Sequence, residues 1–152
     1  MVPSPDKAPQ LAEAFVKTAR DAYGRALDYS LDSLPQVDRI LDDLGRADRG
    51  GADNRLLLVA ASCYLGEVII RAGAGAWVAG GPREPLSLKA GALRAVPHDK
   101  VLKRLEEGPE EALLPYAMLF LEKAQPELEM IAAREAARQR GLFARLKRWV
   151  NA

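Results

Sequence analysis

The chain has 152 residues, a formal net charge of +1 and 49% apolar residues. This length suits one domain with a substantial core, and the composition excludes a chain that is disordered throughout. Cys63 is the only cysteine and His98 the only histidine. An internal disulfide and a zinc site built from cysteine or histidine clusters are therefore excluded. The N-terminus shows no signal-peptide pattern and no apolar run is long enough for a bilayer, so we expect a cytoplasmic protein.

The first third of the chain predicts a leader and two helices. Residues 1–8 are expected to form a flexible leader, and an amphipathic helix to run from Pro9 to near Leu27. Short polar residues at 28–33 favour a turn. Ser33, followed by Pro35 and Gln36, indicates a second helix that starts with a capping box. Its predicted inward residues are Val37, Ile40, Leu41 and Leu44, its predicted outward residues are Asp38, Arg39, Asp42 and Asp43, and a polar loop is expected over 45–53.

The segment Leu56–Ile70 is apolar on nearly every side, which predicts a buried central helix. Its β-branched end leaves a strand at 68–70 as the alternative. Gly66 costs such a helix about 1 kcal/mol relative to alanine, so we expect a neighbouring element to approach it closely.

Glycines and prolines end the helical pattern after residue 72. Short strands are predicted at 76–79, 86–89 and 93–96, with a turn at 90–92, and Trp77 is expected to pack against the central helix. Further helices are predicted from Pro97 to Gly108, from Pro109 onward, and from Pro126 to about Trp149 with an interruption at Gly141. The fold class is therefore α+β, predominantly helical, with a domain over 9–125 and a separate basic amphipathic helix over 126–152.

Glu67 and His98 are the only candidates for catalytic chemistry, and both are weak. Apolar neighbours imply that Glu67 is buried, and a buried carboxylate needs a partner. It could serve acid–base chemistry with His98 or with Asp28 and Asp32, or it could be a structural anchor that accepts bonds from amides of the 28–33 turn or pairs with a basic residue. His98 follows Pro97 at a helix start, where a surface position is the expectation. The serines lack a nucleophile motif, and the glycines lack a phosphate-loop pattern.

The C-terminal segment predicts a basic amphipathic helix. Residues 126–152 hold six Lys or Arg against three Glu. Such a helix is typical of membrane-surface or groove-binding segments, although it could instead fold back onto its own core. Nucleic-acid binding would require more basic residues and a recognisable module. The candidate partner-binding residues are Leu142, Phe143, Arg145, Leu146, Arg148 and Trp149.

Two short motifs resemble those of a family of small uncharacterised bacterial domains with no assigned activity. These are an LDxSxxSL turn, seen at residues 27–34, and a YLGEV helix, seen at 64–68. Trp77 and the Pro-x-x-Lys-Val pattern at 97–101 extend the resemblance, which covers about residues 10–122. Cys63 departs from the family pattern, which has glycine shortly before YLGE. The resemblance implies a shared fold and brings no activity.

Three functional hypotheses follow, none with a cofactor or metal. The first is a non-enzymatic adaptor or regulatory module that binds a protein partner, with the C-terminal helix as the candidate contact. The second is a small enzyme or ligand-binding domain centred on Glu67 with His98. The third is a peripheral adaptor on an anionic membrane surface through residues 141–150. The predicted structural residues are Asp28, Ser30, Ser33, Gly66, Glu67 and Trp77.

Overall fold

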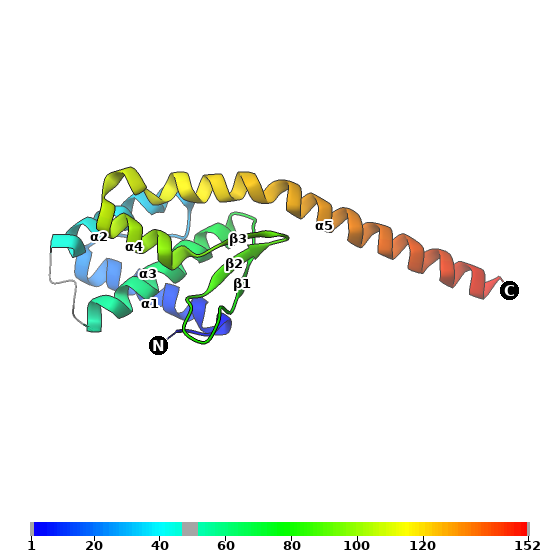
Figure 1. The fold of residues 1–152 in the computed structure, drawn as a ribbon, viewed down its shortest axis with the longest axis horizontal. Helices are drawn as coiled ribbons and strands as arrows, with labels where there is room; N and C mark the ends of the chain where they lie inside the picture. The colour runs from blue at the N-terminus through cyan, green and yellow to red at the C-terminus, as the bar shows by residue number, and fades with distance from the viewer. Residues whose placement is uncertain (1, 47–51, 152) are drawn as a thin grey trace.

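The computed structural model describes residues 2–46 and 52–151, and it has a helical body from which one long helix projects (Figure 1). The chain is 73% helical with a small three-stranded sheet, which confirms the predicted fold class. In chain order the elements are α1 (Ala8–Tyr23), α2 (Leu34–Arg46), α3 (Ala52–Arg71), β1 (Ala76–Val78), β2 (Ser87–Ala90), β3 (Leu93–Ala95), α4 (Pro97–Glu107) and α5 (Leu113–Val150). Short 3-10 turns at Pro5–Lys7, Leu31–Ser33 and Pro109–Glu111 precede α1, α2 and α5.

The central position of α3 follows from its apolar surface, because every side of this helix must be covered. Tyr64, Leu65, Val68 and Ile69 are fully buried, which confirms the predicted buried helix. The alternative of a strand at 68–70 is wrong, since α3 continues to Arg71. Most of the predicted polar loop at 45–53 lies outside the described residues.

Helix α1 packs along α3 through a buried face of small residues and one phenylalanine, namely Ala8, Ala12, Phe15 and Ala19. It ends at Tyr23, four residues earlier than the sequence predicts. Gly24 ends it by adopting a left-handed φ of 65°, which costs glycine little. The N–H of Gly24 donates to the carbonyl of Arg20.

The sheet is antiparallel with the order β1-β2-β3, and it confirms the three predicted strands to within about one residue. Trp77 pairs with Leu88, and Leu88 pairs with Ala95. The turn between β2 and β3 contacts α5, because the Glu127 carboxylate accepts a hydrogen bond from the N–H of Ala92 at 3.1 Å. This contact lies near the point where α5 leaves the body.

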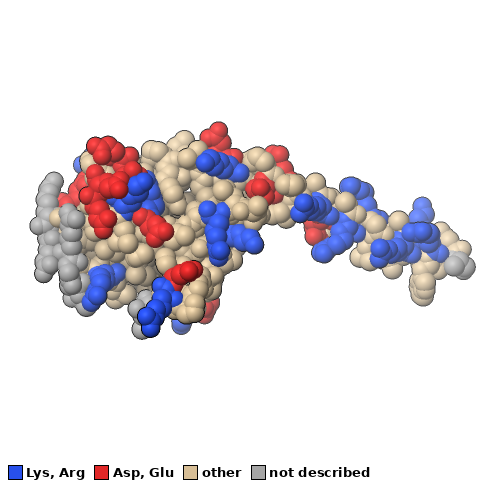
Figure 2. Space-filling view, viewed as in Figure 1, with Lys and Arg blue, Asp and Glu red and all other residues tan. Residues whose placement is uncertain are grey.

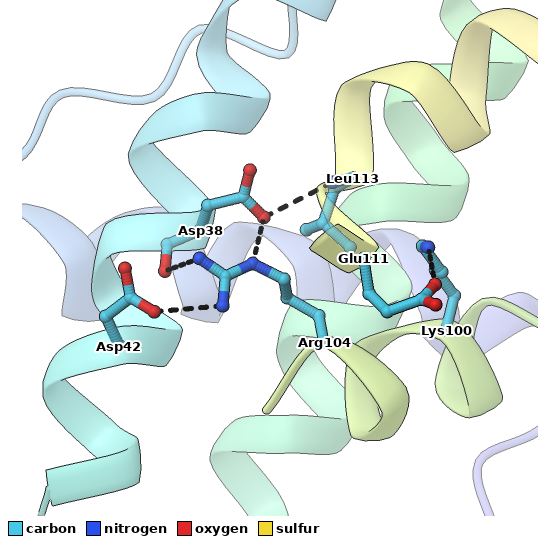
Figure 3. Close-up of polar contacts among 6 residues, drawn as sticks. All are labelled: Asp38, Asp42, Lys100, Arg104, Glu111 and Leu113. Atoms are coloured by element: carbon cyan, nitrogen blue, oxygen red, sulfur yellow. Dashed lines mark hydrogen bonds and ion pairs between the residues drawn. The ribbon is translucent and has the colours of Figure 1, made fainter. Parts of the chain in front are cut away.

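A buried ionic cluster joins α2, α4 and the first residue of α5 (Figure 3). The Arg104 guanidinium, only 3% exposed, contacts Asp38 Oδ1 at 3.1 Å and Asp42 Oδ1 at 2.9 Å. Asp38 also accepts a hydrogen bond from the N–H of Leu113 at 3.3 Å. The prediction that Asp38 faces outward is therefore wrong, because its carboxylate lies between α2 and α4 and binds Arg104. Nearby, Lys100 and Glu111 form an ion pair at 2.7 Å.

Helix α5 is one continuous helix of 38 residues, where the sequence predicts two helices divided before Pro126 and an interruption at Gly141. Both predicted breaks are wrong. Pro126 is exposed, so water can satisfy the carbonyl that its missing N–H leaves free. Gly141 costs about 1 kcal/mol, which neighbouring helix-forming residues offset. The helix begins at Leu113 and not at Pro109, with Pro115 in its first turn, where the proline N–H is not required.

Candidate functional site

The turn at residues 28–33 is attached to α3 by Tyr64, a residue that the sequence analysis does not single out. The Tyr64 hydroxyl lies 2.6 Å from Ser33 Oγ and accepts a hydrogen bond from the N–H of Tyr29 at 3.0 Å. Ser33 donates to the carbonyl of Ser30 at 2.6 Å, and Asp28 accepts two hydrogen bonds from Ser30. Ser33 therefore does not cap α2, and the predicted capping box is wrong. The turn needs no bond from Glu67.

Glu67 instead pairs with Trp77. The indole Nε1 of Trp77 donates to Glu67 Oε2 at 2.8 Å, and Glu67 is 8% exposed. The Trp77 ring lies so close to Gly66 that a Cβ at that position would collide with it. The predicted packing of Trp77 against the central helix is thus confirmed, and so is the predicted close approach of a neighbouring element to Gly66. The sequence predicts a backbone amide of the turn or a basic residue as the partner of Glu67. This prediction is wrong, because β1 positions the indole of Trp77 against the carboxylate.

A partly open pocket of about 130 Å³ lies beside Trp77, between residues 2–3, α3, the β1–β2 loop and the start of α4. His98, predicted at the surface, is half-buried and lines this pocket. Its Nδ1 lies 3.2 Å from Ser62 Oγ, which donates its only proton to the carbonyl of Leu58 at 2.7 Å. The hydrogen between Ser62 and His98 therefore belongs to Nδ1 of the imidazole.

Burial favours the neutral forms of two ionisable groups at this pocket, His98 and Cys63. Burial lowers the pKa of His98, against a smaller opposing effect of Asp99. Burial, aided by the negative charge of Glu67, raises the pKa of the Cys63 thiol to about 12. Cys63 is 3% exposed and lines the same pocket. A protonated thiol and a neutral imidazole leave this part of the pocket wall uncharged.

Glu67 and His98 do not face one common cavity, since His98 lines the pocket and Glu67 does not. Asp28 and Asp32 are exposed and lie on the 28–33 turn, apart from the pocket. Sequence reasoning missed the role of Ser62 and Arg83, which line the pocket beside His98. No local pattern marks them, because α3, the β1–β2 loop and α4 meet only in the folded chain.

The second candidate site is the C-terminal part of α5, residues 129–150, which we call the projecting segment. It extends away from the body (Figure 1), and every residue in it is exposed except the half-buried Ala136. Phe143 is 76% exposed and Trp149 79%. The alternative in which this helix folds back onto its own core is therefore wrong.

The apolar face of the projecting segment continues the face by which α5 packs on the body. The buried residues of α5 recur at steps of three or four, at Leu113, Ala117, Phe120 and Ala124. The same steps lead through Leu128 and Ile131 to Leu142, Leu146 and Trp149. Trp149 lies 36 residues after Leu113, which is ten helical turns, so both point to the same side of the helix. Only Glu135 and Arg138, which form an ion pair at 3.2 Å, interrupt this stripe.

Charge is distributed unevenly between the projecting segment and the body. Residues 136–152 carry five basic residues and no acidic one. Figure 2 shows basic side chains along the outer part of the projecting segment, whereas side chains of both signs lie over the body. The basic residues are Arg138, Arg140, Arg145, Lys147 and Arg148.

Comparison with protein-family models, curated proteins and solved structures gave no match for this chain. No helix over residues 2–46 and 52–151 is long and apolar enough to cross a membrane. The same residues contain no cluster of histidine, cysteine and carboxylate side chains suited to a metal ion.

Proposed function

We propose that the chain is a non-enzymatic interaction module whose projecting segment binds an apolar groove with an acidic rim on a protein partner. The observation that carries this proposal is the apolar stripe of α5, which continues in register beyond the body and is exposed there. A helix face with anchors at steps of three and four is the form in which helices bind grooves.

The position of the body favours a discrete protein partner over a membrane. Because the stripe is continuous, Leu142 and Trp149 point to the side of α5 on which the body lies. A flat surface that touched them along the helix axis would meet the body first. A partner seated beside the body, beneath the projecting segment, meets no such obstacle.

Charge defines the partner further. The five cations of residues 136–152, a stretch without an acidic residue, favour an anionic rim around the apolar groove. The same charge disfavours pairing of two projecting segments, because like charges would face each other in a low-dielectric contact. A second copy of the chain is therefore not the proposed partner.

Photo-crosslinking in the native cells tests the proposal. A photoreactive phenylalanine replaces Leu146 at the centre of the stripe, and Ala144 on the opposite side of the same turn serves as the matched control position. We expect one discrete protein adduct from position 146 and none from position 144. Adducts to phospholipid, to a second copy of the chain or equally from both positions would contradict the proposal.

The identified partner is then purified and its affinity measured against three forms of the whole chain. Leu146→Glu should weaken binding at least tenfold, about 1.4 kcal/mol, because it places a charge in the apolar contact. Ala144→Glu carries the same charge change outside the stripe and should cost much less. Equal losses would show that only the net charge of the segment matters. Binding should also weaken with salt if the rim is acidic.

A further inference from the structure

The pocket beside Trp77 has the size of one six-membered ring. Its volume is about 130 Å³, and an apolar cavity of about 150 Å³ is large enough to take up benzene. A nucleotide, a peptide or a long acyl chain exceeds this space. The enclosed space therefore suits a small monocyclic or branched group, and the partly open side leaves room for a polar substituent.

The walls of the pocket select for apolar groups. Val59, Leu86, Pro97 and the Trp77 ring contribute to the lining, and an aromatic ring favours a second ring in offset or edge-to-face contact. Ser62 uses its donor on Leu58 and its acceptor position on His98. Its hydroxyl therefore requires no partner from a ligand, so an apolar ring can lie against it without leaving a polar group unsatisfied.

Arg83 supplies the one permanent charge among the residues that line the pocket. It is exposed, and within residues 2–46 and 52–151 no carboxylate forms an ion pair with it. The neighbouring Glu84 accepts a hydrogen bond from the N–H of Gly81 at 2.9 Å instead. A guanidinium with free donors binds a carboxylate through two parallel hydrogen bonds. The buried thiol of Cys63 adds no opposing negative charge.

We propose that this pocket binds a small monocyclic carboxylate of about the size of benzoate, with the ring against Trp77 and the carboxylate on Arg83. The binding is reversible and non-covalent, since the protonated Cys63 thiol is a poor nucleophile. This site lies on the body and is independent of the projecting segment, so it gives the chain a small-molecule ligand in addition to the proposed protein partner.

Tryptophan fluorescence tests the proposal directly. The chain has two tryptophans, so Trp149→Phe leaves Trp77 as the only reporter while the body stays intact. We expect a saturable change with benzoate at a Kd of about 1 mM or below, the range open to so small a ligand. Toluene supplies the ring without the charge, and acetate the charge without the ring. Both should bind at least tenfold more weakly than benzoate.

Two matched arginine variants locate the charge contact within the Trp149→Phe background. Arg83→Gln should weaken benzoate binding at least tenfold, whereas Arg94→Gln, at an exposed position of β3 outside the pocket, should leave it unchanged. Val59→Phe should fill the pocket and abolish the response. Both arginines are exposed, so their variants keep the test valid even if Val59→Phe fails to fold. No saturable response to benzoate, equal affinity for toluene, or equal effects of the two arginine variants would overturn the proposal.

Discussion

Replacing Gly66 with alanine should destabilise the body, although alanine is the better residue for a helix. The new Cβ collides with the Trp77 ring of β1, which packs against the core and must shift to admit it. If the ring shifts, its Nε1 withdraws from Glu67 Oε2, now 2.8 Å away. The buried carboxylate would then lose the one partner that the structure provides for it.

The magnitude follows from two opposing effects. Alanine gains about 1 kcal/mol of helix propensity over glycine. Against this stand about 1.5–3 kcal/mol for a lost hydrogen bond to a charged group and about 1–3 kcal/mol for overpacking. The net loss is about 1.5–5 kcal/mol. A loss near 3 kcal/mol would lower the melting temperature by about 6–12 °C in a domain of this size.

Urea unfolding followed by circular dichroism measures this loss. Gly141→Ala is the matched control, because nothing lies within 4 Å of a Cβ added there. It should leave the urea midpoint of the body unchanged. Trp77→Phe removes Nε1 together with part of the ring that packs on Gly66, so it should also lower the midpoint through the lost hydrogen bond and the lost packing. A higher midpoint for Gly66→Ala than for the parent chain would refute the reasoning, because helix propensity alone would then decide.

Further outcomes concern the ionic cluster and the pocket. Asp38→Ala leaves the buried Arg104 with one carboxylate and should lower the free energy of unfolding by about 2–4 kcal/mol. The side chain of Asp42 is 39% exposed, so Asp42→Ala should lower it by only about 0.5–1 kcal/mol in the same urea assay. Equal losses would contradict the cluster geometry. Burial lowers the pKa of His98 below its ordinary 6.5, so the unfolded chain binds the proton first and stability should fall as pH drops below about 6.5. His98→Asn should reduce the dependence of the free energy of unfolding on pH below about 6.5. An unchanged slope would show that other groups cause this dependence. The Cys63 thiol, with its pKa raised to about 12, should react with a disulfide reagent at pH 8 only as fast as the chain unfolds; immediate stoichiometric labelling would show that it is accessible.

Local patterns were sufficient to predict most elements of the body. The all-round apolar surface of α3 required burial, and a glycine inside it required a close neighbour, which Trp77 supplies. The sequence mispredicts the boundaries of α5, because Pro126 and Gly141 are typical helix-breaking residues and yet lie inside this helix. At exposed positions their cost is small enough for the helix to continue through both residues.

Side-chain partners were predicted less well than elements, because each partner depends on how distant segments meet. Glu67 was expected to bind the 28–33 turn, yet Tyr64 already satisfies that turn and Trp77 reaches the carboxylate. Asp38 has the periodicity of a surface residue on α2. Asp38 becomes an ion-pair partner inside the body only because α4, which carries Arg104, packs against α2.

The amphipathic, basic character of the C-terminal helix is a property of the sequence alone, since it follows from residue spacing at 3.6 per turn. The sequence alone does not determine whether that helix docks on the body or projects from it, because the same apolar stripe is compatible with both arrangements. Tertiary structure decides it: the body ends near Leu128, and the stripe continues beyond the last surface that could cover it. The pocket at Trp77 likewise exists only where the N-terminal residues 2–3, α3, the β1–β2 region and the start of α4 converge, so no spacing of residues could predict it.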